Sequence, residues 1–236
     1  MEFLPVLDIF PAETERRWTV LLRLILLIPQ LIVVWLLGIV AVIVLIVGWF
    51  GALALGRLPD FAVNYLSKYL AWDVRVRAYG MLLVDRYPPF AFEAPEYPVR
   101  IELRPGTLNR AAVFFRLILV IPAAIVQAVV TSGWFICAFF IWLIVLITAR
   151  MPQPVFLAAA SLLRFTMRVT AYMYMLTSAY PKRLLGDQPG RDYDASWGAA
   201  SATRPLVLTS GAQGMIVLFI ILGVLAETGS SFSGRN

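Results

Sequence analysis

The chain is poor in the side chains that most enzymes and metal sites use. Its 236 residues include no histidine, one cysteine and only 14% charged residues. Haem ligation by histidine, histidine-based general base catalysis and the common zinc sites are thereby excluded. Cys137 lies within an apolar run, where an inert buried thiol is expected. P-loop, G-x-G-x-x-G and G-x-S-x-G motifs are also missing. We therefore predict no enzyme activity, no metal and no cofactor.

Charge is missing altogether from three long stretches, 24–56, 117–149 and 205–226. Each is longer than the roughly 18 apolar residues that indicate a membrane-spanning helix. Hydrophobic residues make up 61% of the chain. Because no carboxylate lies in these stretches, proton or cation transport through them is not expected. The composition is that of a multi-pass integral membrane protein.

One sequence unit occurs twice. Residues 17–88 align without a gap on residues 110–181, and 23 of the 72 positions are identical. Landmarks shared by the two copies are Arg23/Arg116, Pro29/Pro122, Trp49/Trp142, Arg57/Arg150, Pro59/Pro152, Arg75/Arg168 and Tyr79/Tyr172. A gapless repeat indicates the duplication of one structural unit. We predict two tandem repeats, 1–93 and 94–183, that pack against each other with pseudo-symmetry.

Each repeat contains an apolar block, 18–56 or 111–149, that is too long for one upright helix. A straight helix through either block would be about 60 Å long, twice the hydrocarbon thickness of a bilayer. We predict an apolar helical hairpin in each block, with turns at Gly38 and at Ser132-Gly133. The alternative is a bent helix, which follows the interface as far as Pro29 and then makes one oblique span.

Basic residues favour the hairpin, because they collect at both ends of the apolar blocks. They include Arg16, Arg17, Arg57, Arg86, Arg100, Arg104, Arg110 and Arg150, whereas the predicted turns carry no charge. By the positive-inside rule, the N-terminus and the inter-repeat loop are expected to be cytoplasmic. The net charge of +6 and the pI near 9.8 then reflect attraction to anionic phospholipid headgroups, and nucleic acid is not an expected partner.

A segment that is apolar on one side only follows Pro59 and Pro152. The three- and four-residue spacing predicts amphipathic helices over 60–84 and 154–177. Crossing the bilayer would place Asp73 and its charged neighbours near the middle, at several kcal/mol each. We therefore predict that both helices lie in the membrane interface. The alternative is a second span packed inside a bundle.

The remaining segments complete the predicted fold. Alternation over 99–104 predicts a short strand, and the apolar stretch 4–10 could pair with it in a minor cytoplasmic β-ribbon. Residues 184–204 are interpreted as an exposed linker, and 205–226 as a C-terminal transmembrane helix. The predicted fold class is therefore an all-α integral membrane protein built from two tandem repeats and one further helix.

Several short motifs recur together: R-L-I-L-x-I-P, G-R-x-P or A-R-x-P, R-V-x-A-Y and a closing Y-P. As a set, they resemble an actinobacterial integral membrane family that is classed as a domain of unknown function and often occurs as tandem copies. The resemblance covers about residues 4–185. It implies location in the bacterial cytoplasmic (inner) membrane and supplies no catalytic residue. The D-R-Y-P-P-F ending of 85–90 becomes S-A-Y-P-K-R in repeat 2.

The candidate site residues are the duplicated arginines Arg23, Arg116, Arg75 and Arg168. Arg23 and Arg116 enter the apolar blocks, and snorkelling to the interface is the simplest interpretation. The sharper hypothesis is that each guanidinium holds a lipid phosphate or an acidic partner by bidentate hydrogen bonds. Arg75 and Arg168 on the amphipathic helices would complete such a headgroup site.

Three functional hypotheses follow. The first is a non-enzymatic accessory or structural subunit of an inner-membrane complex for envelope lipid transport or synthesis, in which the final helix, with Gly211, Ala212 and Gly214, docks on another membrane-protein subunit. The second is a membrane-shaping or anionic-lipid-binding protein, because the repeats would add volume to one leaflet. A lipid-acting enzyme or carrier built on Asp85 and Tyr87 ranks last, since no nucleophile, base or metal set can be assembled.

Overall fold

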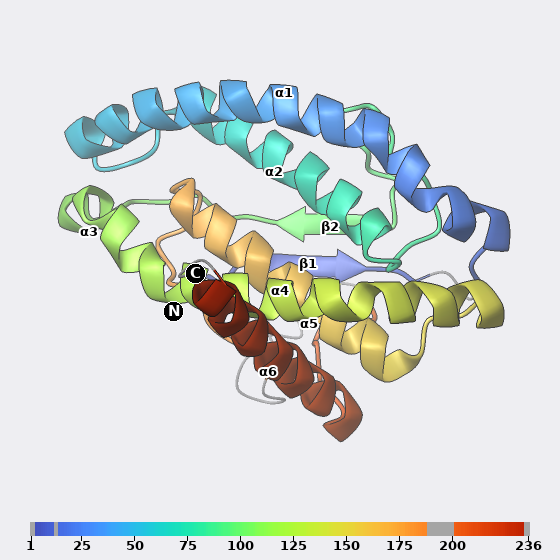
Figure 1. Cartoon of the computed structure of the whole chain (residues 1–236). Helices are drawn as coiled ribbons and strands as arrows, with labels where there is room; N and C mark the ends of the chain where they lie inside the picture. Colours follow the sequence, from blue (N-terminus) through green and yellow to red (C-terminus); the bar gives the residue numbers. More distant parts are fainter. Residues whose placement is uncertain (1–2, 12–13, 188–200, 234–236) are drawn as a thin grey trace.

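The computed structural model describes residues 3–11, 14–187 and 201–233 of the chain. Figure 1 shows the arrangement of its helices and strands. In chain order the elements are β1 (Val6–Ile9), α1 (Arg17–Leu55), α2 (Asp60–Gly80), β2 (Val99–Glu102), α3 (Arg110–Phe114), α4 (Arg116–Thr148), α5 (Gln153–Met173) and α6 (Ser210–Ser233).

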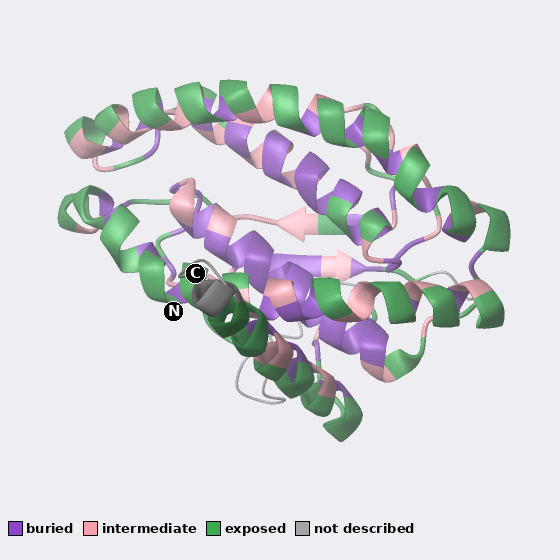
Figure 2. Ribbon diagram, in the orientation of Figure 1, coloured by how far each residue is buried: buried purple, intermediate pink, exposed green. Residues whose placement is uncertain are grey.

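The elements form three layers. The ribbon of β1 and β2 contacts the inner helices, because β2 packs on α2 and β1 packs on α5. The inner helices contact each other and carry the outer helices, with α1 on α2 and α4 on α5. Helix α6 packs across α4 and α5. Figure 2 shows that burial follows these layers, since α2 and α5 are largely buried while α1, α4 and α6 are exposed along their outer sides.

The predicted hairpins are wrong, because each apolar block continues as one long helix. Helix α1 runs through Gly38, and α4 runs through Ser132 and Gly133. Neither site is free to turn. Gly38 lies under the hydroxyl of Tyr69, and a Cβ at Gly133 would collide with the backbone of Phe219 in α6. Apart from the positions at Pro29 and Pro122, a continuous helix also pairs its internal backbone groups in an apolar setting, which a turn would not.

The outer helices bury only a narrow stripe. In α1 the buried residues recur at three- and four-residue spacing: Val20, Arg23, Leu27, Gln30, Val34, Ala41, Gly48 and Ala52. The other sides carry exposed apolar groups, such as Trp18 and Trp35 at 76% and 67% exposure. Four helices, α1, α4, α5 and α6, are long and apolar enough to cross a membrane. An exposed apolar surface of this extent is consistent with the predicted membrane protein.

The two predicted amphipathic helices form, but they occupy the inner layer and not a surface. They end at Gly80 and Met173, four residues earlier than predicted. Helix α5 is enclosed by α2, α4, α6 and β1. The charged groups expected to seek interfacial water find partners in the chain instead, as when Arg164 Nη1 meets Asp187 Oδ2 at 2.6 Å. The interfacial location is therefore corrected to packing inside the helical assembly.

The β-ribbon pairs as predicted, with its second strand ending at Glu102. Its strands lie 93 positions apart in the chain and so occupy equivalent places ahead of the two repeats. They pair antiparallel, with Val6 opposite Glu102 and Ile9 opposite Val99. In this register, a rotation of 180° about an axis through the centre of the ribbon places each strand on the other. The ribbon therefore sets up a pseudo-two-fold relation between the halves of the molecule.

Contacts between the outer helices follow the same relation. Trp49 Nε1 donates to Val113 O (3.1 Å) and Trp142 Nε1 to Val20 O (2.8 Å), while Arg17 Nη2 donates to Ile147 O (3.1 Å) and Arg110 Nη2 to Ala54 O (2.9 Å). Each bond has a counterpart with the roles of the repeats exchanged. The two arginines place positive charge at the C-terminal ends of the opposite outer helices, where the helix dipole favours it. Helix α1 thus runs antiparallel to the pair of α3 and α4, joined to α3 at one end and to α4 at the other.

The C-terminal part differs from the predicted boundaries. Most of the predicted 184–204 linker, residues 188–200, lies outside the described residues. The predicted final span begins later, at Ser210, and extends to Ser233. Helix α6 lies so close to α4 that a Cβ at Gly223 would collide with the backbone of Val129. Ala212, predicted to face a partner, is buried within this chain.

Candidate functional site

All four arginines predicted as headgroup contacts are buried. The exposed fractions of Arg23, Arg75, Arg116 and Arg168 are 2%, 3%, 4% and 3%. None snorkels to an interface, because each donates to acceptors of this chain. Arg23 and Arg75 share no hydrogen-bond acceptor among the described residues.

Arg23 and Arg116 close the C-terminal ends of the inner helices. Arg23 Nη1 donates to the carbonyl oxygen of Tyr79 at 3.1 Å, and Arg116 Nε donates to that of Tyr172 at 2.5 Å. Each guanidinium also lies over the ring of the same tyrosine, 4.5 Å and 4.0 Å from the centroid. A cation at this end of a helix complements the helix dipole and satisfies a terminal carbonyl.

Only repeat 1 surrounds this arginine with carboxylates. Arg23 Nη2 lies 2.5 Å from Glu15 Oε2 and 3.4 Å from Asp85 Oδ1. Burial raises the pKa of Glu15 to about 7, the Arg23 charge opposes this rise, and Asp85 adds to it. Two carboxylates thus share one guanidinium, and protonation of Glu15 extends toward neutral pH. Repeat 2 has Leu108 and Ser178 at the equivalent positions.

Arg75 and Arg168 hold chain segments beside the inner helices. Arg75 Nη2 donates to Ala91 O at 2.7 Å. Arg168 Nε donates to Pro5 O at 2.9 Å, and its Nη1 donates to Lys182 O at 3.1 Å. A lipid headgroup would reach either guanidinium only after these segments moved. Headgroup contact by the four arginines therefore stays a prediction, and their observed bonds are structural.

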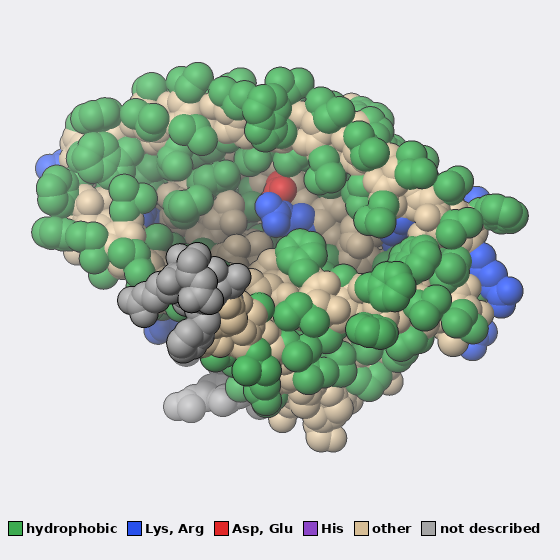
Figure 3. Space-filling view, viewed as in Figure 1, with side chains coloured by type: hydrophobic (Ala, Val, Ile, Leu, Met, Phe, Trp, Pro, Cys, Tyr) green, Lys and Arg blue, Asp and Glu red, His purple; other side chains and the backbone are tan. Residues whose placement is uncertain are grey.

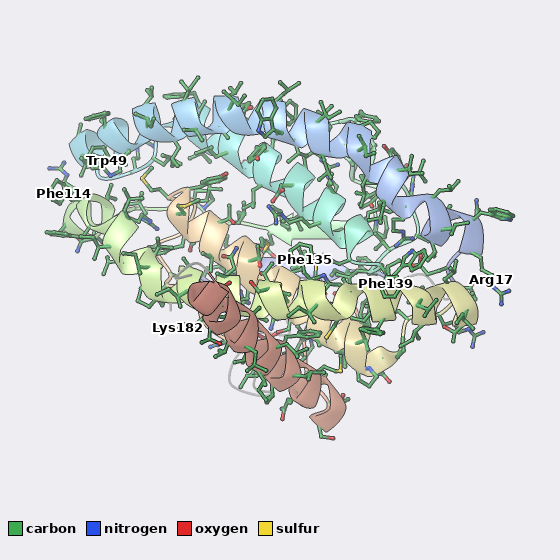
Figure 4. All side chains as sticks on the ribbon, in the orientation of Figure 1. Arg17, Trp49, Phe114, Phe135, Phe139 and Lys182 are labelled. Atoms are coloured by element: carbon green, nitrogen blue, oxygen red, sulfur yellow. The ribbon has the colours of Figure 1, made fainter. Side chains whose placement is uncertain are left out.

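A hollow opens on the apolar face of the molecule. Figure 3 shows it between α1 and the α4–α6 side, with hydrophobic side chains around it and basic and acidic atoms at its floor. Phe135 and Phe139 lie on the α4 side in Figure 4, and they are 70% and 63% exposed. The inner helices lie behind the hollow (Figure 1). Its rim is thus supplied by the outer helices and its floor by the inner layer.

We assign the charged atoms at this floor to an ion pair on α2, because Arg77 is half-exposed and interacts electrostatically with Tyr174, which directly follows α5. Arg77 Nε donates to Asp73 Oδ2 at 2.7 Å. The Arg77 side chain is 51% exposed, whereas that of Asp73 is 11% exposed. Neither terminal nitrogen of Arg77 has a hydrogen-bond acceptor among the described residues. The pair presents donors to the hollow while its net charge is zero.

Two tyrosines extend this polar floor. The rings of Tyr69 and Tyr174 lie 6.2 Å apart, and both interact electrostatically with Asp73 and Arg77. Burial raises the pKa of each hydroxyl, and Asp73 raises it further. Both hydroxyls therefore remain protonated at neutral pH and can donate hydrogen bonds. Tyr174 directly follows α5, so both repeats contribute to the floor.

Sequence reasoning did not single out this group, although one local signal was present. Asp73 and Arg77 are four residues apart on a predicted helix, the spacing at which opposite charges pair. The equivalent residues in repeat 2 are Thr166 and Thr170. The duplicated arginines were the basis for predicting site residues, whereas the Asp73–Arg77 pair occurs in one repeat only.

The side chains at the floor are suited to binding a ligand. Guanidinium and hydroxyl groups donate hydrogen bonds, and the carboxylate accepts them. Within residues 3–11, 14–187 and 201–233, no cluster of three histidine, cysteine or acidic side chains could hold a metal ion. The lone thiol, Cys137, lies on α4 and does not belong to the ion-pair group.

Comparison with known proteins identifies the family. A model described as a domain of unknown function (DUF4389) matches the chain twice, at residues 17–91 and 110–184. The chain belongs to the DUF4389 family. The two matches are the tandem copies predicted from the repeat, and together they cover more than half of this DUF4389 protein. Neither the curated proteins nor the solved structures contain a significant match. The first match includes the Asp73–Arg77 pair, whereas α6, which borders the hollow, lies outside both matches.

Proposed function

We propose that this DUF4389 protein is a non-enzymatic protein of the bacterial inner membrane whose outer helices lie in one leaflet and organise lipid around them. One observation carries the proposal. The outer helices α1 and α4 form an exposed apolar face, and the charged β-ribbon lies beyond the inner helices. A molecule with this polarity is amphipathic as a whole. Its apolar face belongs in hydrocarbon, and its ribbon belongs in water.

The lengths of the outer helices support a position along the membrane plane. Helix α1 has 39 residues and α4 has 33, so they are about 58 and 50 Å long, well beyond the roughly 30 Å hydrocarbon core. Arg17 meets the end of α4, and Arg110 meets the end of α1. Lying flat keeps both ends at headgroup depth, where arginine attracts anionic lipid. This orientation satisfies the same charge pattern that suggested hairpins.

Helices placed in this way would add volume to one leaflet, while α6 would cross to the other side. The expected consequence is membrane curvature toward that leaflet. Liposomes reconstituted with the protein should therefore shrink or form tubules as the protein density rises. Vesicles of unchanged size and shape at high protein density would count against the membrane-organising role.

Depth measurements test the orientation itself. In a Cys137→Ala background, single cysteines replace Leu24, Leu31 and Val42, which are exposed along one side of α1, and each carries a spin label. We expect equal depths from power saturation with oxygen and a nickel chelate. An oblique span would instead change the depth by roughly half of the ~27 Å between the first and last labels. A depth gradient of that size would overturn the proposal.

Helix α6 supplies the matched control for these depths. Labels at Val217 and Val224, both partly exposed on this helix, should lie at clearly different depths because α6 is proposed to cross. Equal depths on α6 together with a gradient on α1 would reverse the proposed arrangement.

One argument for the accessory-subunit hypothesis, the docking role of the final helix, no longer applies. The hypothesis can still be tested directly. It used the final helix as a docking element, whereas α6 packs tightly on α4 of the same chain. Affinity purification of the tagged protein from native membranes in mild detergent decides between the two. A second membrane protein at fixed stoichiometry would favour the subunit role, and repeated recovery of the protein alone would argue against it.

A further inference from the structure

The hollow on the apolar face contains polar groups that hydrocarbon cannot satisfy. The terminal nitrogens of Arg77 and the hydroxyls of Tyr69 and Tyr174 make no hydrogen bond to a described residue, and α1, α4 and α6 border the opening with apolar side chains. Exposing such donors to acyl chains alone is unfavourable. The occupant of the hollow must therefore combine polar acceptors at the floor with an apolar part at the opening.

The charge at the floor limits which kind of polar headgroup can bind in the hollow. Asp73 already neutralises Arg77, so an anionic headgroup would bring an uncompensated negative charge into a poorly solvated site. A headgroup with both a phosphate and a primary ammonium brings none. Its phosphate matches the guanidinium edge, and its ammonium matches the second oxygen of Asp73, which accepts no hydrogen bond from a described residue.

The direction of the hollow fits a lipid of the same leaflet. Its floor lies on the inner helices, toward the ribbon, and its opening lies between the outer helices (Figures 1 and 3). With the ribbon in water, as in the proposed function on which this step rests, the floor is at headgroup depth and the opening faces the acyl chains. A phospholipid can enter with its head at the floor and its tails between α1 and α4.

We propose that the hollow binds one zwitterionic phospholipid with a phosphoethanolamine headgroup. Arg77 donates to the phosphate, Asp73 accepts from the ammonium, and the hydroxyls of Tyr69 and Tyr174 donate to phosphate or ester oxygens. The ion pair of this site belongs to repeat 1 of the duplicated domain, because Thr166 and Thr170 replace it in repeat 2. The occupant is held by a single guanidinium–carboxylate pair, which lies on α2.

Lipid retention tests this proposal. The full chain is reconstituted in bilayers of equal parts phosphatidylethanolamine, phosphatidylglycerol and phosphatidylcholine. It is then extracted in mild detergent, and the retained lipid is measured by native mass spectrometry. We expect one phosphatidylethanolamine per protein, enriched over the other two lipids. Retained lipid with the composition of the bilayer, or enrichment of phosphatidylglycerol, would overturn the proposal.

Variants locate the bound lipid. Arg77→Gln should lower the retention at least about tenfold, because it removes charge-assisted bonds to phosphate. Asp73→Asn should reduce the preference for phosphatidylethanolamine over phosphatidylcholine. The double variant Asp73→Thr/Arg77→Thr installs the residues of repeat 2 and should abolish specific retention. It also provides a second readout if Arg77→Gln fails to fold, as judged by circular dichroism and gel filtration.

Arg104→Gln is the matched control, because Arg104 is exposed on the ribbon side and pairs with Glu102. Its lipid retention should equal that of the unmodified protein. Equal losses in Arg104→Gln and Arg77→Gln would overturn the site. The depth labels separate the two proposals: flat depths without lipid enrichment reject this site alone, and a depth gradient along α1 rejects the proposed function.

Discussion

The two repeats place the same arginine in the same position and surround it differently. Arg23 and Arg116 each donate a hydrogen bond to a backbone carbonyl near the C-terminal end of an inner helix. Each guanidinium also lies over a tyrosine ring. Arg23 also meets Glu15 and Asp85, whereas Arg116 meets backbone carbonyls. Duplicated residues thus maintain the common framework. Residues found in one copy only create its charge pairs, including the pair at the floor of the hollow.

The repeats share backbone conformation even where their residues differ. Gly56 and Ala149, at equivalent helix ends, both adopt left-handed φ values, 70° and 56°. Leu82 and Met175, after the inner helices, both have a φ of 61°. These values show that the turn geometry came from the shared framework and persists where a side chain makes it less favourable. The comparison therefore separates what the framework demands from what each copy adds.

The largest expected effect comes from removing the two arginines in turn. Arg23→Met should cost about 3–5 kcal/mol of the free energy of unfolding, because the buried Glu15 loses its counter-charge and the partly buried Asp85 loses one of its partners. Arg116→Met leaves only carbonyls without a donor and should cost about 1–3 kcal/mol. Unfolding by SDS in mixed micelles, followed by tryptophan fluorescence, measures both values.

Exposed Arg104→Met is the control and should change the free energy by less than about 1 kcal/mol. Adding Glu15→Gln and Asp85→Asn should recover much of the loss in Arg23→Met. An equal or larger cost for Arg116→Met would show that the carboxylates do not distinguish the repeats.

The next effect is a pH dependence confined to repeat 1. The folded-state pKa of Glu15, about 7, lies above its ordinary value of 4.5. The folded protein therefore binds the proton more tightly, and the stabilisation is complete below about pH 4.5 and lost as pH rises through 7. The free energy of unfolding should fall by up to about 3 kcal/mol between pH 5 and 8. Glu15→Gln should flatten this slope, and an unchanged slope would assign the dependence to another group.

The smallest effect concerns the two left-handed helix ends. Ala149→Gly should raise the free energy of unfolding by about 1 kcal/mol, because glycine adopts this φ without a steric penalty. Gly56→Ala should lower it by a similar amount. The added methyl itself meets nothing closer than 3.6 Å, so the cost is conformational. Changes of opposite sign in the free energy of unfolding for the two variants, measured in the same SDS titration, would confirm that one geometry serves both repeats. Changes of the same sign would contradict it.

Much of the framework was predictable because its signals are local. Pro59 and Pro152 indicated where the inner helices begin, and alternation indicated the strand at 99–102. The hairpin prediction failed because length and hydropathy do not decide whether a glycine turns. At Gly38 and Gly133 the decision lies with Tyr69 and Phe219, which approach from other helices.

The candidate site was less predictable than the fold. The duplication indicated four candidate arginines. All four are buried in the structure, where they bond to other groups of the chain. The Asp73–Arg77 spacing was visible in the chain, but a charged pair on a helix does not reveal which side of that helix other elements leave open. That question depends on where α1, α4 and α5 lie around α2.

The sequence by itself determined the apolar segments long enough to cross a membrane, the duplication and the starts of the inner helices, because composition, periodicity and proline act within a few residues along the chain. Only the tertiary structure decided that the apolar blocks stay continuous, that their partner helices lie inside, and that one ion pair is left facing an apolar hollow. These outcomes depend on contacts between segments far apart in the chain. There, burial and backbone collision between helices outweigh local preference.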